Sequence, residues 1–226
     1  MLSRLFYFRR FMQSKHYKVS FKGEDLILLP EKAIWFPKYE TLLVSDTHLG
    51  KGSHFRKAGI AIPTQLEQED LATLSDIIAE IKPKELIFLG DLFHSDINND
   101  WEWFKLWRQL HQKINMALIK GNHDILPPMF YKTLNIDVVQ SKKIGVFELY
   151  HDLPKTQTAH YIISGHIHPG IKITGKAKQG LVLPCFYFGK QYAILPAFGK
   201  FTGKAIIKRK ENDLVYAIAG KNIIAV

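Results

Sequence analysis

The chain has 226 residues, long enough for one large domain, and its 46% hydrophobic and 23% charged residues are usual for a soluble protein, which excludes a disordered chain. No apolar run approaches the roughly eighteen residues of a membrane-spanning helix, so we expect no membrane partner, and the single cysteine, Cys185, excludes an internal disulfide and favours the cytoplasm. Lysine and arginine number 31 against 21 aspartates and glutamates, and the net charge of +10 favours polyanionic partners.

The first fifteen residues are basic and aromatic and begin MLSRLFYFRRF. Their apolar stretch over 5–8 is too short for a secretory signal. An arginine-rich transit peptide is the alternative to our preferred interpretation, a disordered leader over 1–15, and Met12 offers a second start. No linker or repeat follows, so residues 16–226 are predicted to form a single domain.

Strand and helix patterns alternate over the first 120 residues. Short apolar runs predict strands over 16–21, 26–29, 41–45, 85–89 and 116–119. A helix is predicted over 65–81, where Thr64 and Glu67 form a capping box and Pro83 ends the helix. A second helix is predicted over 100–112, with one buried face of Trp103, Leu106, Trp107 and Leu110. This alternation predicts an α/β sheet covered by helices.

Strand patterns dominate after Asn135, and no helix is predicted there. The predicted strands are 144–150, 161–164, 181–188, 192–195, 205–207 and 214–219. A second, largely antiparallel sheet packed on the first would bury one face of each.

Aspartate, asparagine and histidine follow five of these strands directly. In chain order the segments are Asp-Thr-His (46–48), Gly-Asp (90–91), Gly-Asn-His-Asp (121–124), His-Asp (151–152) and Gly-His-Ile-His (165–168). Ligand sites of open α/β sheets form at the carboxyl ends of strands, so these side chains are expected to converge. Imidazole, carboxylate and amide donors without cysteine suit Mn²⁺, Fe or Zn²⁺. With Asp91 as a bridge, they divide into two metal sites that leave room for water and phosphate oxygens.

Each segment has a plain alternative when taken alone. A single histidine is more often a surface or hydrogen-bonded core residue, and Gly-Asp or Gly-Asn pairs are commonly turns. Five such segments in one chain, each at a strand end, favour a metal site.

The motifs SDTHLG (45–50), GDLFH (90–94), GNHD (121–124), HD (151–152) and GHIH (165–168) resemble those of the calcineurin-like metallophosphoesterases. The resemblance implies a four-layer α/β/β/α sandwich of two mixed β-sheets. It implies two divalent ions, Mn²⁺ in the first place and Fe, Zn²⁺ or Mg²⁺ as alternatives. The first ion would take Asp46, His48, Asp91 and His168, and the second Asp91, Asn122, His151 and His166. His123 would stand unligated beside the phosphate, with Asp124 holding its ring.

A closer resemblance lies outside the metal motifs. The segments Leu-Leu-Pro (28–30) with Lys32, Gly-Lys (50–51) through Arg56, and Leu-Pro-Ala-Phe-Gly (195–199) resemble the DNA-ligase-associated bacterial metallophosphoesterases. That resemblance implies DNA as a partner, together with ligase or helicase repair proteins. The subgroup more often has a second glycine at the position of Lys204.

Four further residues are candidate contacts. His94 and Arg56 follow metal motifs and are suited to phosphate, with ordinary loop roles as the alternative. Lys200 and Lys204 belong to a segment after Tyr187 in which basic and aromatic residues alternate, as in a surface that tracks nucleic acid. The same aromatic residues would also suit core strands.

The sequence therefore predicts a dinuclear-metal-dependent phosphodiesterase, with DNA as the expected substrate. In this scheme a metal-bridging hydroxide attacks phosphorus and His123 protonates the leaving group. One alternative is a phosphomonoesterase, cyclic-nucleotide phosphodiesterase or pyrophosphatase that acts on a small molecule, because specificity lies in loops. A scaffold that has lost its metals is the other, and the complete ligand set disfavours it. The sequence does not indicate an oligomeric state.

Overall fold

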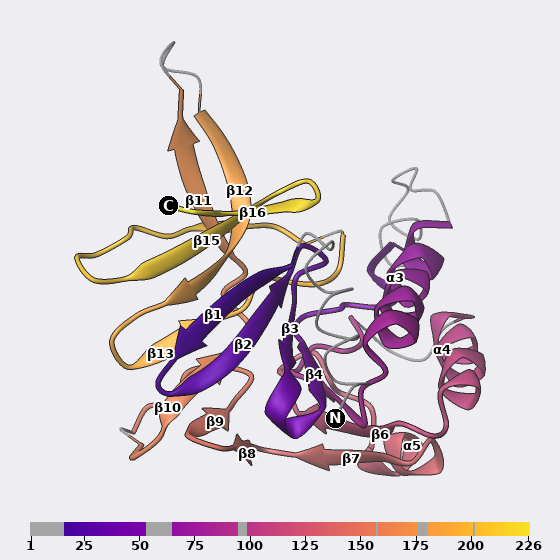
Figure 1. Cartoon of the computed structure of the whole chain (residues 1–226). Helices are drawn as coiled ribbons and strands as arrows, with labels where there is room; N and C mark the ends of the chain where they lie inside the picture. The colour runs from indigo at the N-terminus through magenta and orange to yellow at the C-terminus, as the bar shows by residue number, and fades with distance from the viewer. Residues whose placement is uncertain (1–15, 53–64, 95–98, 157, 176–179, 201) are drawn as a thin grey trace, which may run out of the picture.

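The computed structural model describes residues 16–52, 65–94, 99–156, 158–175, 180–200 and 202–226 (Figure 1). The predicted leader over 1–15, Thr64 of the capping box and Arg56 lie outside the described residues. The division into a leader and one domain therefore stays a prediction. None of the described helices is long and apolar enough to cross a membrane.

The first sheet holds seven strands in sequence order within the described residues. They are β1 (Tyr17–Phe21), β2 (Glu24–Leu29), β3 (Ala33–Phe36), β4 (Thr41–Val44), β5 (Glu85–Phe88), β6 (Asn115–Ile119) and β7 (Ile136–Val139). Neighbours pair antiparallel from β1 to β4 and parallel from β4 to β7. The carboxyl ends of β4, β5 and β6 therefore meet at one edge, where the predicted ligands begin.

The described helices follow β4, β5 and β6 and lie beside the first sheet (Figure 1). They are α3 (Gln65–Ile81), α4 (Asn99–Leu110) and α5 (Pro128–Thr133), and a short 3₁₀ turn, η1 (Pro37–Tyr39), precedes β4. The prediction for α3 is confirmed, and its apolar stripe is buried: Leu71, Leu74, Ile77, Ile78 and Ile81. Neither α5 nor the strands β3 and β7 were predicted from local pattern.

The buried face of α4 differs from the predicted one. Trp101, Phe104 and Trp107 are buried, and the rings of Trp101 and Phe104 lie 5.2 Å from the ring of Phe93. Three residues predicted in the core are exposed: Trp103 at 50%, Leu106 at 54% and Leu110 at 81%. The helix carries two apolar stripes, and the stripe whose rings reach the aromatic residues after β5 is the one that packs inward.

The second sheet is mixed, and most of its strand pairings are antiparallel, as predicted. Its strands are β8 (Lys142–Ile144), β9 (Phe147–Leu149), β10 (Tyr161–Ser164), β11 (Pro169–Thr174), β12 (Gly180–Phe188), β13 (Tyr192–Ile194), β14 (Ala205–Ile206), β15 (Leu214–Ala219) and β16 (Asn222–Ala225). The order is β14-β11-β12-β13-β10-β9-β8, with β15 and then β16 beside β12. β10 pairs parallel with both β9 and β13. The single strand predicted over 144–150 is a hairpin of β8 and β9, turned at Gly145, whose φ is +54°.

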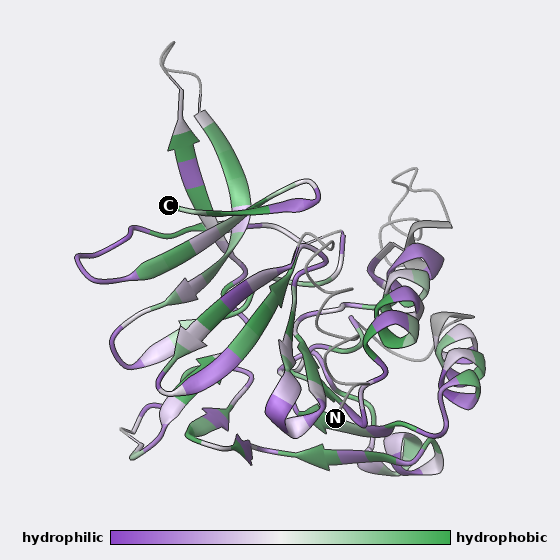
Figure 2. Cartoon of the chain, viewed as in Figure 1, coloured by the Kyte–Doolittle hydropathy of each residue, from purple (hydrophilic) through white to green (hydrophobic). Residues whose placement is uncertain are grey.

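The core lies in two main layers. One apolar cluster, with Phe88, Phe104 and Leu74, fills the space between the first sheet and the helices. Another, with Phe36, Phe147 and Phe186, lies between the two sheets, as the two-sheet prediction required. Figure 2 shows the strands mostly in the green of apolar residues.

The predicted α/β arrangement of two mixed β-sheets is confirmed, and the outer face of the second sheet carries a small apolar cluster of its own. Among the described residues no helix follows β7, and a small third cluster that includes Cys185 and Val215 occupies this face. Ile207 packs against it, and the hydroxyl of Tyr187 donates a hydrogen bond to Asp213 Oδ2 at 2.8 Å.

Candidate metal centre

The predicted ligands lie on sharp turns at the strand ends. Five of them have a positive φ, which costs a residue other than glycine about 1–3 kcal/mol: Asp46, His48, Asp91, His166 and His168. Backbone hydrogen bonds hold two of these turns together, from Asp46 N to Gly90 O at 3.2 Å and from His48 N to Asp91 O at 2.9 Å. Such backbone strain persists only where the surrounding structure holds the residue in place. These turns direct the ligand side chains toward a common site.

Asp46, His48 and His168 form a first cluster, whose ligand atoms all lie within 4.8 Å of one another. Nε2 of His168 is 3.1 Å from Oδ1 of Asp46. Within the described part of the chain these two atoms and both ring nitrogens of His48 are buried without a hydrogen-bond partner. Buried polar atoms are nearly always paired, so a cluster of unpaired acceptors indicates a cation.

Asp91, His151 and His166 form a second cluster of the same kind. Nε2 of His151 is 3.4 Å from Asp91 Oδ1, 3.2 Å from His166 Nδ1 and 3.0 Å from Oδ1 of Asn122. Nδ1 of His151 lies 2.9 Å from the carbonyl of Leu89, which can only accept, so Nδ1 carries the proton. That hydrogen bond leaves the Nε2 lone pair for a cation, the usual arrangement of a metal-binding histidine.

The carboxylate of Asp91 connects the two clusters. Its Oδ2 faces His48 at 3.8 Å, and its Oδ1 faces His151 at 3.4 Å. Oδ1 also accepts a hydrogen bond from His123 N at 2.9 Å, which fixes the orientation of the carboxylate. This geometry supports Asp91 as a bridge between two cations.

Burial and neighbouring charges give His48 and Asp91 the protonation states in which they can bind a cation. Burial lowers the pKa of His48 to about 4, although the charges of Asp46 and Asp91 raise it. Burial raises the pKa of Asp91, but the hydrogen bond and charge of His151 outweigh burial and lower this pKa to about 2. Burial lowers the pKa of His151, but Asp91 and the Leu89 carbonyl raise it to about 9. His48 is therefore neutral and Asp91 charged near pH 7.

The carboxylate of Asp124 accepts hydrogen bonds from the backbone of two loops of the site. Its Oδ2 accepts hydrogen bonds from the backbone N–H groups of Asp91 and Gly121, both at 2.8 Å, and its Oδ1 accepts one from Leu92 at 3.0 Å. Burial raises the pKa of Asp124 above its ordinary value, although the hydrogen bonds from these backbone donors oppose that rise. The carboxylate therefore joins the loops after β5 and β6, and its hold on the ring of His123 stays a prediction.

His123 stands beside the first cluster. Its ring lies 5.4 Å from the ring of His48 and stacks on the ring of His94 at 5.0 Å. His94 therefore lies directly beside His123. Its predicted contact with phosphate stays a prediction. Arg56, the other predicted phosphate contact, lies outside the described residues.

Lys200 and Lys204, the predicted nucleic-acid contacts, line a cavity of about 50 Å³ beside His168. Lys32 lines the same cavity, and its role there was not predicted from the sequence. The one signal for Lys32 in the sequence was its place after Leu-Leu-Pro (28–30), in a segment that resembles the DNA-ligase-associated metallophosphoesterases. Tyr187, Phe188 and Phe198 are buried, so these three aromatic residues belong to the core and offer no surface for stacking on bases. Tyr192 is partly buried and lines the larger basic cleft, and Phe201 lies outside the described residues.

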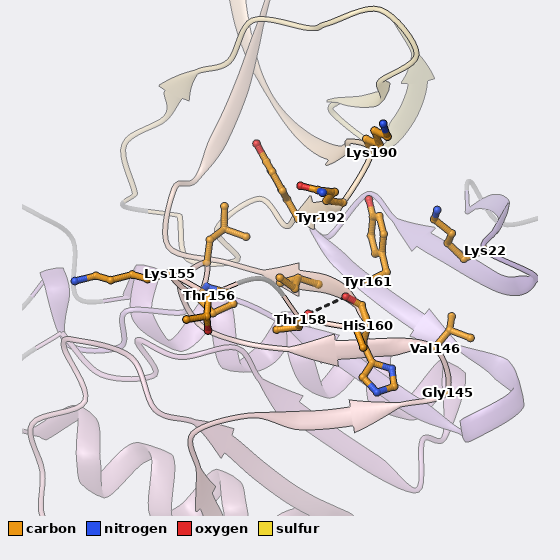
Figure 3. Close-up of a pocket in the computed structure, with 15 residues that line it drawn as sticks. Lys22, Gly145, Val146, Lys155, Thr156, Thr158, His160, Tyr161, Lys190 and Tyr192 are labelled. Atoms are coloured by element: carbon orange, nitrogen blue, oxygen red, sulfur yellow. Dashed lines mark hydrogen bonds between the residues drawn. The ribbon is translucent and has the colours of Figure 1, made fainter.

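A larger cleft of about 810 Å³ opens at the other end of β10 (Figure 3). Lys22, Lys155, Lys190 and His160 line it, and none of its described lining residues is acidic. Tyr161 in this cleft begins β10, whereas the strand runs toward His166 at its carboxyl end. The cleft therefore lies away from both ligand clusters.

The sequence model of the calcineurin-like phosphoesterase family matches residues 39–153. The structure is similar to the crystal structure of Pseudomonas putida nuclease MPE, with a TM-score of 0.77 and 30% sequence identity over 93% of this chain and 100% of that one. It also matches YfcE, a phosphoesterase from E. coli, with a TM-score of 0.43 and 15% identity over 82% of this chain and 96% of that one. No curated protein matches the sequence. The chain belongs to the calcineurin-like phosphoesterases and is a metal-dependent phosphoesterase.

Proposed function

We propose that the protein cleaves phosphodiester bonds in DNA and does so with two divalent cations, one at each cluster. The observation that supports the phosphoesterase chemistry is the Asp91 carboxylate, whose two oxygens face His48 of one cluster and His151 of the other. The whole-length likeness to a nuclease and the net charge of +10 support a polyanionic substrate. Mn²⁺ is the first choice of ion, since imidazole and carboxylate donors suit it.

The residues divide the work of the reaction among them. Asp46, His48, Asp91 and His168 would hold one cation, and Asp91, Asn122, His151 and His166 the other. Such a pair supplies a nucleophilic hydroxide near neutral pH and neutralises charge on the phosphoryl oxygens. His123 is the proposed general acid, which donates its ring proton to the leaving oxygen. Asp124 and the hydrogen bond of His151 to Leu89 keep these groups in position.

The test compares metal-dependent hydrolysis of four substrates: bis(p-nitrophenyl) phosphate, p-nitrophenyl phosphate, a single-stranded oligonucleotide and a circular duplex. The proposal predicts hydrolysis of the diester and of DNA above that of the monoester, and loss of all activity in Asp91→Asn. Preference for the monoester, or turnover of the small diester with no cleavage of either DNA, would instead favour a small-molecule substrate. Activity that Asp91→Asn retains in full would contradict the metal assignment.

A further inference from the structure

The small cavity beside His168 has a wall of three lysines: Lys32, Lys200 and Lys204. A cavity of about 50 Å³ has room for a few water molecules or one phosphate-sized group. His168 belongs to the first ligand cluster, so a group in this cavity would be a close neighbour of the reacting phosphate.

Lys32 is held in place by the fold. It occupies the turn between β2 and β3 with a φ of +66°, and its N–H donates to Leu29 O at 2.9 Å. Its ammonium donates a hydrogen bond to Phe198 O at 3.2 Å, while Phe198 N donates to Ser45 O at 2.7 Å. The ammonium is thereby tied to the strand end that leads into Asp46. One carbonyl satisfies one of its three N–H groups, which leaves two for a ligand.

The charges around the cavity leave a positive excess. The charge of Asp70 attracts the Lys32 ammonium, and the charges of Lys200 and Lys204 repel it. Lys200 forms an ion pair with Glu69. Lys204 is exposed and has no ion-pair partner within the described residues. Three lysines against the two carboxylates of Glu69 and Asp70 leave a net positive charge around this space, which suits an anion.

We infer that Lys32 and Lys204 form a subsite for the phosphate that flanks the scissile one in a nucleic-acid strand, on the His168 side of the metal centre. This inference rests on the proposed function. The subsite accounts for a preference for a polynucleotide over a small diester, because a small diester carries no second phosphate. It also sets the direction in which the strand leaves the metal centre.

The test measures whether the lysines and the flanking charge act together. Short oligonucleotides with one cleavable bond carry either a phosphate or a neutral methylphosphonate at the adjacent position, on the 5′ side in one set and on the 3′ side in another. We expect Lys32→Gln and Lys204→Gln each to lower kcat/KM about tenfold when the flanking phosphate is present, as for loss of a charge-assisted hydrogen bond. With the methylphosphonate on that side, the loss should shrink to about twofold or less.

Matched controls come from the separate basic cleft. Lys22→Gln and Lys190→Gln remove one positive charge each at a distance from the metal centre, and neither should distinguish the two substrates. Lys204→Arg keeps the charge and should retain the coupling. Since Lys204 is exposed, its variant remains informative if Lys32→Gln folds poorly.

The outcomes separate the two proposals. Lysine and methylphosphonate effects that are independent on both sides of the cleavable bond would overturn the subsite, even if the native protein cleaves the oligonucleotide. No cleavage of any oligonucleotide by a protein that hydrolyses a small diester would overturn the proposed DNA substrate. Coupling that appears equally in Lys190→Gln would show general attraction by net charge and would also overturn the subsite.

Discussion

Asp91 is the residue on which the two clusters depend. It has a positive φ, accepts a hydrogen bond from the backbone of His123 and directs one carboxylate oxygen to each cluster. Asp124 holds the backbone at this position, because its carboxylate accepts a hydrogen bond from Asp91 N. A bridging ligand must be oriented as well as present, and the backbone around Asp91 supplies that orientation.

His123 allows proton donation to be separated from metal binding. It belongs to neither ligand cluster, so His123→Ala should retain both cations. The variant should lose about 10²–10⁴-fold in kcat on esters with high-pKa leaving groups, the usual contribution of a positioned acid. Activated nitrophenyl esters need little proton donation and should lose far less. Rates on a series of leaving groups measure this, and equal losses along the series would show that His123 acts only as a stabilising charge.

Gly90 tests the placement of His151. A Cβ atom at Gly90 would overlap the His151 ring, with its Cβ at 2.8 Å, and φ at Gly90 is +74°. Gly23 has a similar φ of +79° and open space around it. Both Gly90→Ala and Gly23→Ala should lose about 1–2 kcal/mol of stability from backbone strain, but only Gly90→Ala should lose metal from the second cluster. Metal content after dialysis measures the difference, and unchanged content in Gly90→Ala would contradict the geometry.

At the scale of elements, helix α3 holds the chain segment that contains Lys200. Asp70 on α3 is buried and accepts a hydrogen bond from Lys200 N at 3.3 Å. Burial raises the pKa of Asp70 to about 6, although the bond from Lys200 and the charges of Lys200 and Lys32 lower it. The folded pKa is above the ordinary value of about 3.9, so the native state binds this proton more tightly than the unfolded chain does.

The sign of that shift fixes a stability prediction. Ionisation of Asp70 reduces stability as the pH rises from about 4 through the folded pKa of about 6, and the reduction is nearly complete about one pH unit above that pKa. Asp70→Asn should therefore gain about 1–3 kcal/mol relative to the native protein at pH 7.5, with little gain at pH 4. Urea unfolding at the two pH values measures it, with exposed Asp76→Asn on the same helix as control. A gain that is the same at both values would show that ionisation of Asp70 is not the cause.

The elements were predicted best where their local signals are strong. The strand ends that carry Asp46, Asp91 and His166 follow buried apolar runs, and α3 has a complete stripe with a proline stop. The buried face of α4 could not be predicted, because the choice between its stripes depends on Phe93, which lies outside the helix. Strands such as β7 and β16 are short and partly exposed, so their sequences lack a clear period.

The candidate site, too, could be predicted from the sequence only where its motifs are local. The ligand types and their order were readable because each motif is local. The hydrogen bonds of Asp124 and the approach of Lys32 to Lys204 were not, because they join residues distant in the chain. Tyr187, Phe188 and Phe198 are buried as core strands require, whereas contact of Lys200 and Lys204 with nucleic acid stays a prediction.

On the scale of the whole molecule, each cluster draws on both sheets. Asp46 and His48 follow β4 of the first sheet, whereas His168 follows β10 of the second. Asp91 follows β5, and its partners His151 and His166 follow β9 and β10. The site is therefore complete only when the two sheets pack on the cluster that includes Phe36 and Phe147. Cations that bind there would stabilise the native state over the unfolded chain.

The number of cations per chain tests the central claim most directly. Elemental analysis of protein reconstituted with Mn²⁺ should give two ions per native chain, one in His168→Ala, one in His151→Ala, and weakened binding of both in Asp91→Asn. The two histidine variants remove a ligand from one cluster each, whereas Asp91 serves both. One ion or none at saturation in the native protein, or two tightly held ions in Asp91→Asn, would contradict a dinuclear centre bridged by Asp91.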